Sequence, residues 1–196
     1  MKIGKNETVA LVAAGANLPS EAGYPELTIH KALEMLEKYG HTVDLVSNYY
    51  RTPCFPVGAG PDFMNVAARI VTLSDPAALL SDLHLVEKSF GRKRIARWSA
   101  RTLDLDLLAV DDTIVPDATT FVHWRDLSPE MQQVQGPDQL ILPHPRIQDR
   151  AFVLIPLADI APDWRHPVLR KTVAEMLKDL PRSDREAVKV IKTPHL

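Results

Sequence analysis

Leucine and aspartate alternate along one short stretch of the chain, Arg101-Thr102-Leu103-Asp104-Leu105-Asp106-Leu107-Leu108. In an extended strand, successive side chains point to opposite faces, so Asp104 and Asp106 share one face, roughly 6 to 7 Å apart. Leu103, Leu105 and Leu107 share the other face, which we expect to be buried. This pattern therefore predicts a strand with a hydrophobic core on one side and a pair of carboxylates on the other.

The carboxylate pair is typical of a site for a hard cation. Magnesium keeps several water ligands and takes one or two protein carboxylates together with phosphate oxygens. A basic segment precedes the strand, and its cations are Arg92, Lys93, Arg94, Arg97 and Arg101. Guanidinium groups bind phosphate oxygens in a bidentate manner. Each feature alone is compatible with a solvated loop or an ordinary edge strand, but their adjacency predicts a site for a nucleotide and metal ions.

The overall composition excludes several other classes of protein. The chain has 196 residues, a formal net charge of −2 and 45% hydrophobic residues. A protein that mainly binds nucleic acid more often carries a basic balance over the whole domain. No apolar run approaches the roughly 20 residues that cross a bilayer. We expect one domain over residues 1–196 and small-molecule substrates, without nucleic-acid or membrane partners. The sequence leaves the oligomeric state open, and a monomer is our expectation.

Cysteine usage and the N-terminal segment bear on the cellular compartment. Cys54 is the single cysteine, which excludes an intramolecular disulfide and favours a reducing compartment. The apolar run at residues 9–14 is short and is followed at once by Gly15, so it predicts a first strand rather than a secretion signal. We therefore expect a cytoplasmic protein. No histidine cluster accompanies Cys54, which disfavours a zinc site.

The hydrophobic pattern predicts a mixed α and β architecture. Strands are expected over residues 8–14, 42–50, 63–73, 103–110, 152–160 and 187–191, and helices over 25–39, 76–90 and 173–180. Thr172 and Glu175 have the spacing of a capping box for the last helix. We expect residues 116–139 to form an irregular insertion, and the sequence assigns it no role. The order of elements predicts a ferredoxin-like α+β sandwich, in which a mainly antiparallel sheet is covered by helices.

Four blocks of sequence resemble one known family in their order along residues 8–165. They are Gly15-Ala16-Asn17-Leu18; Tyr50-Arg51-Thr52-Pro53 with Asp62-Phe63-Met64-Asn65; Gly91 to Asp106; and Leu142-Pro143-His144-Pro145 through Arg150-Ala151-Phe152. The third block is the most specific. The chain resembles the 6-hydroxymethyl-7,8-dihydropterin pyrophosphokinases, the folate-pathway enzymes that transfer pyrophosphate from ATP to a pterin alcohol.

The resemblance implies a role for each matching residue. Two Mg²⁺ ions would be held by Asp104 and Asp106, which form the catalytic set with Arg92 and Arg101. The further contacts to ATP would come from Arg94, His144 and Arg150. The loop is about one residue shorter than is usual in the family, which leaves Arg94 and Arg97 both open as the matching arginine. The pterin would be bound by Thr52, Phe55, Phe63, Asn65, Trp98 and Phe152, with the rings of Phe63 and Phe152 on its two faces.

The resemblance also implies the reaction, an in-line attack of the pterin hydroxymethyl oxygen on the β-phosphorus of ATP that releases AMP. The identity of a general base stays open. Two other functions remain compatible with the residues alone: a magnesium-dependent nucleotide transferase with another acceptor, and an RNA-binding ferredoxin-like module, since such sheets also present aromatic side chains to bases. A scaffold domain that has lost its chemistry is a third alternative.

Overall fold

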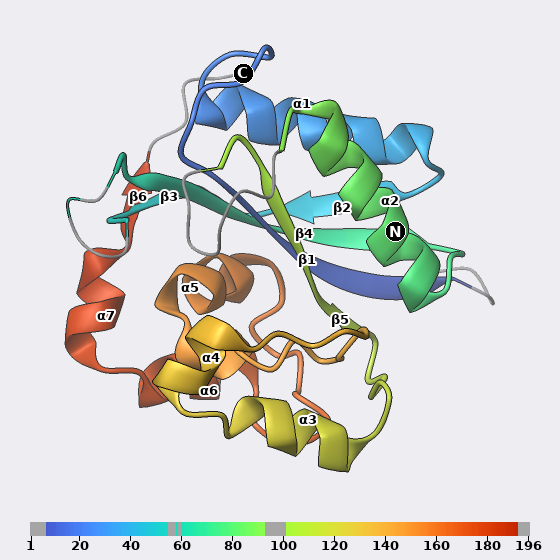
Figure 1. Cartoon of the computed structure of the whole chain (residues 1–196), viewed down its shortest axis with the longest axis vertical. Coiled ribbons are helices and arrows are strands. Elements are labelled where there is room, and N and C mark those ends of the chain that lie inside the picture. The colour runs from blue at the N-terminus through green and yellow to red at the C-terminus, as the bar shows by residue number, and fades with distance from the viewer. Residues whose placement is uncertain (1–6, 55–57, 59, 93–100, 192–196) are drawn as a thin grey trace.

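The computed structural model describes residues 7–54, 58, 60–92 and 101–191 (Figure 1). A six-stranded antiparallel sheet lies at the centre of this part of the chain, in the order β5-β1-β4-β3-β6, and β2 also pairs with β4. The strands are β1 (Thr8–Ala16), β2 (Thr42–Val46), β3 (Tyr49–Thr52), β4 (Phe63–Thr72), β5 (Asp104–Val110) and β6 (Lys189–Ile191). The helices are α1 (Pro25–Lys38), α2 (Pro76–Ser89), α3 (Ala118–Arg125), α4 (Pro129–Val134), α5 (Ala151–Ile160), α6 (Val173–Asp179) and α7 (Arg182–Ala187), with a 3-10 turn at Ile147–Asp149.

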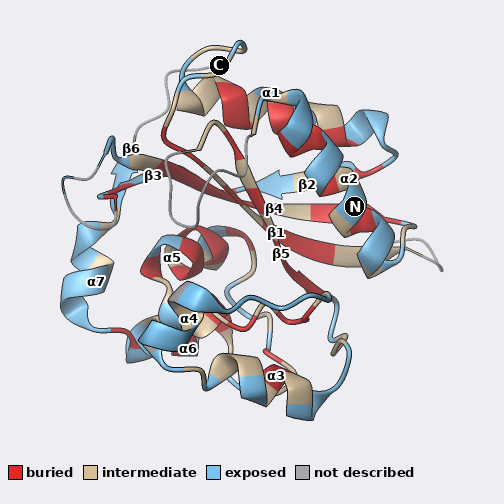
Figure 2. Ribbon diagram, in the orientation of Figure 1, coloured by how far each residue is buried: buried red, intermediate tan, exposed pale blue. Residues whose placement is uncertain are grey.

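Helices cover both faces of the sheet. Helices α1 and α2 pack on one face, where Val12 of β1 and Leu105 of β5 belong to the same buried cluster. Helix α5 packs on the other face, which we call the α5 face, and α6 packs against α5. Leu11 points to the α5 face because side chains alternate along a strand. Figure 2 shows α5 as one of the most buried helices and α7 as one of the most exposed.

This arrangement confirms the predicted ferredoxin-like α+β sandwich. Helices α1 and α2 begin at Pro25 and Pro76, as the sequence predicts, and the side chain of Asp75 accepts the N–H of Ala78 at 2.8 Å. The capping box of α6 is also present, since Thr172 and Glu175 each accept a backbone N–H from the other residue. Among the described helices, none is long and apolar enough to cross a membrane.

The prediction of a strand over residues 152–160 is wrong, because this segment forms helix α5. One side of α5 packs on the sheet and another packs on α6, so the helix is apolar nearly all round. A short apolar run without a clear period does not distinguish a buried strand from a buried helix. Pro156 lies inside the helix, which local propensity disfavours.

Two other predicted boundaries differ from the structure. The single strand expected over residues 42–50 is divided into β2 and β3 at Ser47 and Asn48. The side-chain oxygen of Ser47 accepts the N–H of Ala67, and the N–H of Asn48 donates to Asp159 of α5 at 3.0 Å. These contacts replace the regular ladder at this point. The segment expected to be irregular, residues 116–139, contains α3 and α4, whose N-caps are Asp117 and Ser128.

His166 is a buried histidine that links α3 to the turn before α6. Its ring lies 5.1 Å from the ring of Phe121 and 5.6 Å from that of Trp164, measured between centroids. Its Nδ1 atom accepts the N–H groups of Val168 and Leu169, so the proton is assigned to Nε2. Burial, with a smaller contribution from Arg125, lowers the pKa of His166 to about 4.

We expect the protein to lose stability as the pH falls from 6.5 to 4. In this range the unfolded state binds a proton on His166 that the folded state does not bind, so unfolding is favoured on acidification. The difference between 6.5 and about 4 corresponds to roughly 3 kcal/mol at pH 4. Urea unfolding at pH 7 and pH 4 of the wild type and of His166→Asn measures this contribution. Equal losses of unfolding free energy in the two proteins would contradict it.

Candidate active site

Strand β5 presents its two aspartates on the α5 face. Leu105 and Leu107 of the strand, and Leu103 just before it, point to the opposite face and are at most 4% exposed. The predicted alternation is therefore confirmed. Asp104 lies opposite Gly15 of β1, and Gly15 lies opposite Asn65 of β4. Directly opposite residues share a face, so Asp104, Gly15 and Asn65 form one transverse row on the α5 face, roughly 10 Å wide.

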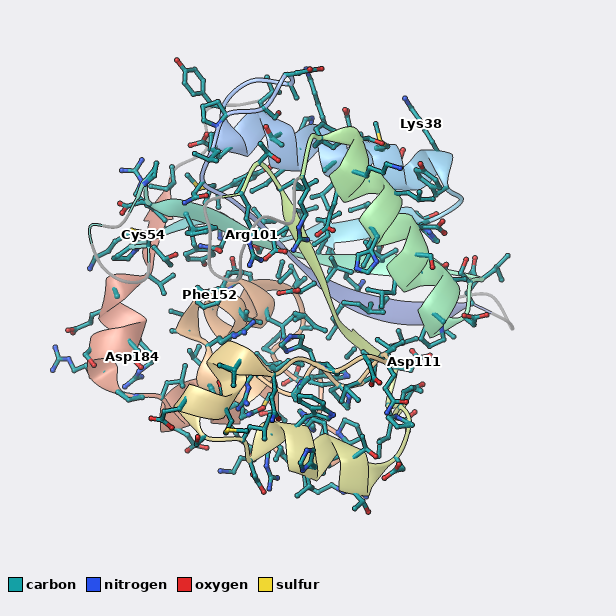
Figure 3. All side chains as sticks on the ribbon, in the orientation of Figure 1. Lys38, Cys54, Arg101, Asp111, Phe152 and Asp184 are labelled. Carbon is teal, nitrogen blue, oxygen red and sulfur yellow. The ribbon has the colours of Figure 1, made fainter. Side chains whose placement is uncertain are left out.

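Three arginines converge on the two aspartates. The guanidinium of Arg101 pairs with Oδ2 of Asp104, and Nη1 of Arg92 lies 2.7 Å from Oδ1 of the same carboxylate. Nη1 of Arg150, at the start of α5, lies 3.8 Å from Oδ2 of Asp106. Figure 3 shows Arg101 and Phe152 in the central part of the molecule, whereas Asp111 lies at the far end of β5. The structure thus brings Arg92, Arg101 and Arg150 to the predicted acidic pair.

The aspartate pair is electrostatically strained. Burial raises the pKa of Asp104 most, and the negative charge of Asp106 raises it further, while Arg101 and Arg92 lower it. Oδ1 of Asp104 is buried and has no hydrogen bond within the described residues, although Arg92 approaches it as an ion pair. A buried carboxylate beside a like charge is a favourable environment for a bound cation.

Glu87 of α2 is a third acid at this site. Its side chain is 2% exposed, and its Oε1 atom accepts the backbone N–H of Leu105 at 2.7 Å. The guanidinium of Arg92 pairs with the same carboxylate. No role for Glu87 is predicted from the sequence. A signal was present, however, because Glu87 continues the stripe of Leu79 and Leu83 that faces the core at helical spacing.

His144 lies beside the arginines in a neutral form. Its backbone N–H donates to the carbonyl of Leu108, which fixes the segment along β5. Its Nδ1 atom accepts the N–H of Arg146 at 3.1 Å, so the proton is assigned to Nε2. Burial, and then the positive charges of Arg150 and Arg146, lower the pKa of His144 to about 3. At neutral pH, His144 is therefore a neutral hydrogen-bond donor.

Three of the residues predicted to bind the pterin, Thr52, Phe63 and Asn65, lie at the other end of the transverse row. Asn65 donates its side-chain N–H to the hydroxyl of Thr52 at 2.8 Å, and both residues are buried. Phe63 pairs with Thr52 across β4 and β3 and therefore points to the same face as Asn65. Phe152 is 39% exposed at the start of α5, with the guanidinium of Arg150 at 5.6 Å from its ring centroid. Phe55, Arg94, Arg97 and Trp98 lie outside the described residues.

Asn17 ties the two halves of the site together. Its side chain is buried, accepts the N–H of Arg101 at 2.7 Å and donates to the carbonyl of Pro61 at 3.1 Å. The N–H groups of Asn17 and Leu18 also donate to the carbonyl of Arg101. The end of the arginine segment is thereby fixed to the loop that precedes Phe63. Asn17 belongs to the first of the four matching blocks, but no role is predicted for it from the sequence.

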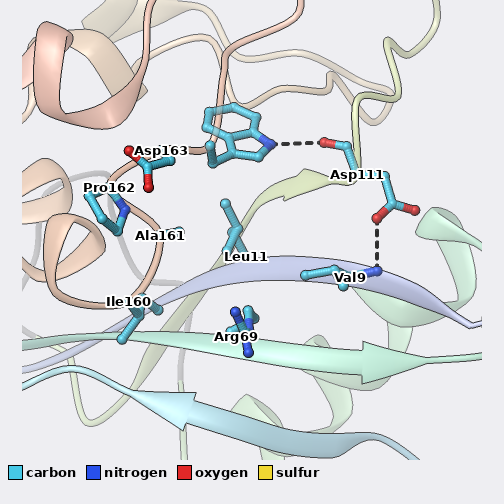
Figure 4. Close-up of a pocket in the computed structure, with 9 residues that line it drawn as sticks. Val9, Leu11, Arg69, Asp111, Ile160, Ala161, Pro162 and Asp163 are labelled. Carbon is cyan, nitrogen blue, oxygen red and sulfur yellow. Dashed lines mark hydrogen bonds between the residues drawn. The ribbon is translucent and has the colours of Figure 1, made fainter. Parts of the chain in front are cut away.

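A separate pocket on the α5 face lies away from these residues. It has a volume of about 310 Å³ and is lined by residues that include Val9, Asp111 and Trp164 (Figure 4). It is located at the end of β5 opposite to Asp104. Arg69, a cation on its wall, already pairs with Asp44 of β2. We therefore place the candidate active site at the aspartate pair and not in this pocket.

We expect Asn17→Ala to lower the free energy of unfolding by about 1–3 kcal/mol, because the substitution leaves the partly buried N–H of Arg101 and the carbonyl of Pro61 without their side-chain partner. Urea unfolding measures the change. The control is Asn48→Ala, which also removes a side-chain hydrogen bond, at 2.9 Å to Asp159, but at an exposed position. Equal effects of the two substitutions would contradict the proposed tie.

Comparisons with known proteins agree with this geometry. The family model described as 7,8-dihydro-6-hydroxymethylpterin-pyrophosphokinase (HPPK) matches residues 11–162. A 2-amino-4-hydroxy-6-hydroxymethyldihydropteridine pyrophosphokinase of Pseudomonas aeruginosa is 36% identical over 158 residues, which cover 80% of this chain and 82% of that protein. The enzyme of the same name from Haemophilus influenzae is 29% identical, with 92% and 97% covered.

Two further relatives are longer than the matched region. The chain spans 62% of the length of the pyrophosphokinase of the same name from Synechocystis, to which it is 34% identical over 72% of its own residues. A crystal structure of an HPPK-DHPS protein from Plasmodium falciparum superimposes with a TM-score of 0.64 and 16% identity, covering 95% of this chain and 47% of that one. This structural likeness supports the fold. From the family model and the sequence relatives together, the chain belongs to the 7,8-dihydro-6-hydroxymethylpterin-pyrophosphokinase family.

Proposed function

We propose that this chain transfers a diphosphate group from ATP to the hydroxymethyl oxygen of 6-hydroxymethyl-7,8-dihydropterin, giving AMP and the pterin diphosphate in folate biosynthesis. The observation that carries the proposal is the transverse row on the α5 face. At one end of the row Asp104 lies among arginines, and at the other end Asn65 lies beside Thr52. The row therefore places groups suited to a polyphosphate next to groups suited to the edge of a heterocycle.

Magnesium fits the aspartate end of the row. Asp104 and Asp106 would hold two Mg²⁺ ions, because they offer hard oxygen ligands whose mutual repulsion a cation relieves. The metal, when bound, neutralises charge on the phosphate oxygens. Oδ1 of Asp104, which makes no hydrogen bond in the described residues, is available as a ligand once Arg92 turns to phosphate.

The side chains of the protein supply charge and position. Arg92, Arg101 and Arg150 bind the negative oxygens of the triphosphate and stabilise the charge that grows during transfer. Neutral His144 donates its Nε2–H to a phosphate oxygen without adding a charge. The alcohol oxygen gives up its proton, ultimately to water, and forms a bond to the β-phosphorus. The bond from that phosphorus to the α–β bridging oxygen breaks, and its electron pair leaves with AMP. Most of the rate enhancement is then expected from orientation and electrostatics.

The pterin end of the row supplies recognition. Thr52 and Asn65 are buried polar groups, and a site that hydrogen-bonds the edge of a substrate rejects analogues that lack those groups. Phe63 and Phe152 offer aromatic faces to the flat ring. Phe55 and Trp98 remain proposed contributors that lie outside the described residues, as does Arg94 for ATP.

The same geometry disfavours an RNA-binding module. Asp104 and Asp106 occupy the α5 face of the sheet, where carboxylates repel a phosphate backbone unless cations intervene. The overall charge of −2 gives no general attraction for nucleic acid. We accordingly propose small-molecule substrates only, for a single domain over residues 1–196. A monomer in the cytoplasm stays a prediction.

We expect the protein to form AMP, and not ADP, when it is incubated with ATP, Mg²⁺ and 6-hydroxymethyl-7,8-dihydropterin. Chromatography of the nucleotides, with and without the pterin, measures this outcome. ADP as the product would indicate transfer of a single phosphoryl group. Turnover that does not depend on the pterin would indicate another acceptor, and either result would overturn the proposal.

A matched pair of variants serves as the control for this experiment. Asp104→Asn is expected to lower kcat by about a thousandfold, because the substitution removes a charge at the proposed metal and phosphate site. Asp111→Asn makes the same chemical change at the far end of β5, where the carboxylate accepts the N–H of Val9. Its kcat is expected to equal that of the wild type. Circular dichroism checks that both variants are folded.

We expect Phe152→Ala to raise the KM for the pterin about tenfold, because stacking of a base on an aromatic ring contributes roughly 1–3 kcal/mol. Phe152→Tyr keeps the ring and is expected to keep the KM of the wild type. The KM for ATP should change little in either variant. Steady-state kinetics with each substrate varied in turn provides the measurement, and an unchanged pterin KM in Phe152→Ala would exclude stacking on this ring.

A further inference from the structure

We propose that Glu87 is a positioning residue, which holds the guanidinium of Arg92 beside the phosphate site and fixes the strand between the two aspartates. This inference deepens the proposed function and rests on it. Glu87 itself points its carboxylate at Leu105 and Arg92, so it acts through them.

Glu87 supplies an acceptor that the sheet lacks. Strand β5 is the outer strand beside β1, so the N–H groups of alternate residues point away from the ladder. Leu105 has such an N–H group, and Oε1 of Glu87 accepts it at 2.7 Å. Leu105 lies between Asp104 and Asp106, so this hydrogen bond fixes the backbone that carries both carboxylates. Without this acceptor, the N–H would be buried without a partner, which destabilises the strand.

Glu87 holds Arg92 by two connections, one from its carboxylate and one from its backbone carbonyl. The side chains of Glu87 and Arg92 form an ion pair, and the backbone N–H of Arg92 donates to the carbonyl of Glu87 at 3.2 Å. The side chain of Arg92 is only 16% exposed. A buried carboxylate needs a counter-charge, so Glu87 and Arg92 stabilise each other in the charged state.

Arg92 is shared between Glu87 and Asp104. Its Nη1 atom lies 2.7 Å from Oδ1 of Asp104 and also pairs with Glu87. Oδ1 of Asp104 cannot pair with Arg92 and coordinate a cation at the same time. Glu87 then remains as the anchor that keeps Arg92 at the site while its guanidinium contacts phosphate. If Glu87 only joined α2 to the sheet, its hydrogen bond to Leu105 would be enough, and it would not need to pair with Arg92 as well.

The test uses Glu87→Gln in the full-length protein. The amide oxygen of glutamine can still accept the N–H of Leu105, whereas the charge that holds Arg92 is lost. We expect the affinity for Mg²⁺ with α,β-methylene-ATP, measured by calorimetry, to fall about tenfold, which is the size of a charge-assisted hydrogen bond. We expect kcat to fall by a similar factor, while the KM for the pterin and the melting temperature stay close to those of the wild type.

A double-mutant cycle identifies Arg92 as the residue through which Glu87 acts. In an Arg92→Ala background, Glu87→Gln is expected to weaken nucleotide binding less than twofold further, because the partner is already absent. Asp82→Asn is the matched control on the same helix, where the carboxylate pairs with buried His41. It is expected to leave nucleotide binding and kcat unchanged.

The inference is overturned if Glu87→Gln binds the nucleotide as the wild type does. It is also overturned if Glu87→Gln causes the same tenfold loss in the Arg92→Ala background. A third contrary result is that Glu87→Gln lowers the melting temperature and binds the nucleotide normally at temperatures well below it, because the loss would then come from unfolding. A different result would overturn the proposed function, namely that the wild type forms no AMP in a pterin-dependent reaction. The calorimetric comparison does not depend on that result.

Discussion

The candidate active site depends on the burial of the leucines that alternate with Asp104 and Asp106. Leu103, Leu105 and Leu107 are almost completely buried, and each contributes roughly 1.5–3 kcal/mol to folding. The repulsion between two carboxylates about 6–7 Å apart is only about 2–3 kcal/mol at an effective dielectric constant near 20. The leucines therefore outweigh the repulsion and force Asp104 and Asp106 onto one face. The strain that remains at Asp104 is what a cation or an arginine relieves.

Strand β1 joins the two proposed substrate sites. Gly15 separates Asp104 from Asn65, and a Cβ atom at Gly15 would already lie 3.4 Å from Oδ1 of Asn65. A larger side chain here would fill the space between the aspartate end and the pterin end of the row. Immediately beyond the strand, Asn17 binds the backbone of Arg101 and of Pro61. Under the proposed function, Gly15 of β1 and Asn17 just beyond the strand thus set the distance between phosphate and heterocycle.

The features that the sequence predicted correctly are those determined by nearby residues. The alternation in β5 and the capping box of Thr172 and Glu175 involve partners within a few positions. The break between β2 and β3 depends on Asp159, which is 111 residues from Asn48, and the run at 152–160 is a helix because of what surrounds it. The roles of Asn17 and Glu87 also depend on distant partners, so their residue types alone did not reveal them.

The described charges at the site balance without any ligand. The negative groups are Asp104, Asp106 and Glu87, and the positive groups are Arg92, Arg101 and Arg150, while His144 is neutral. Adding a nucleotide alone or cations alone would leave a large net charge in a partly buried site, which is costly. Under the proposed function, two Mg²⁺ ions carry as much charge as the ATP that they accompany. Charge balance therefore favours joint binding of metal and nucleotide, and it explains why a site for a polyanion contains as many acids as bases.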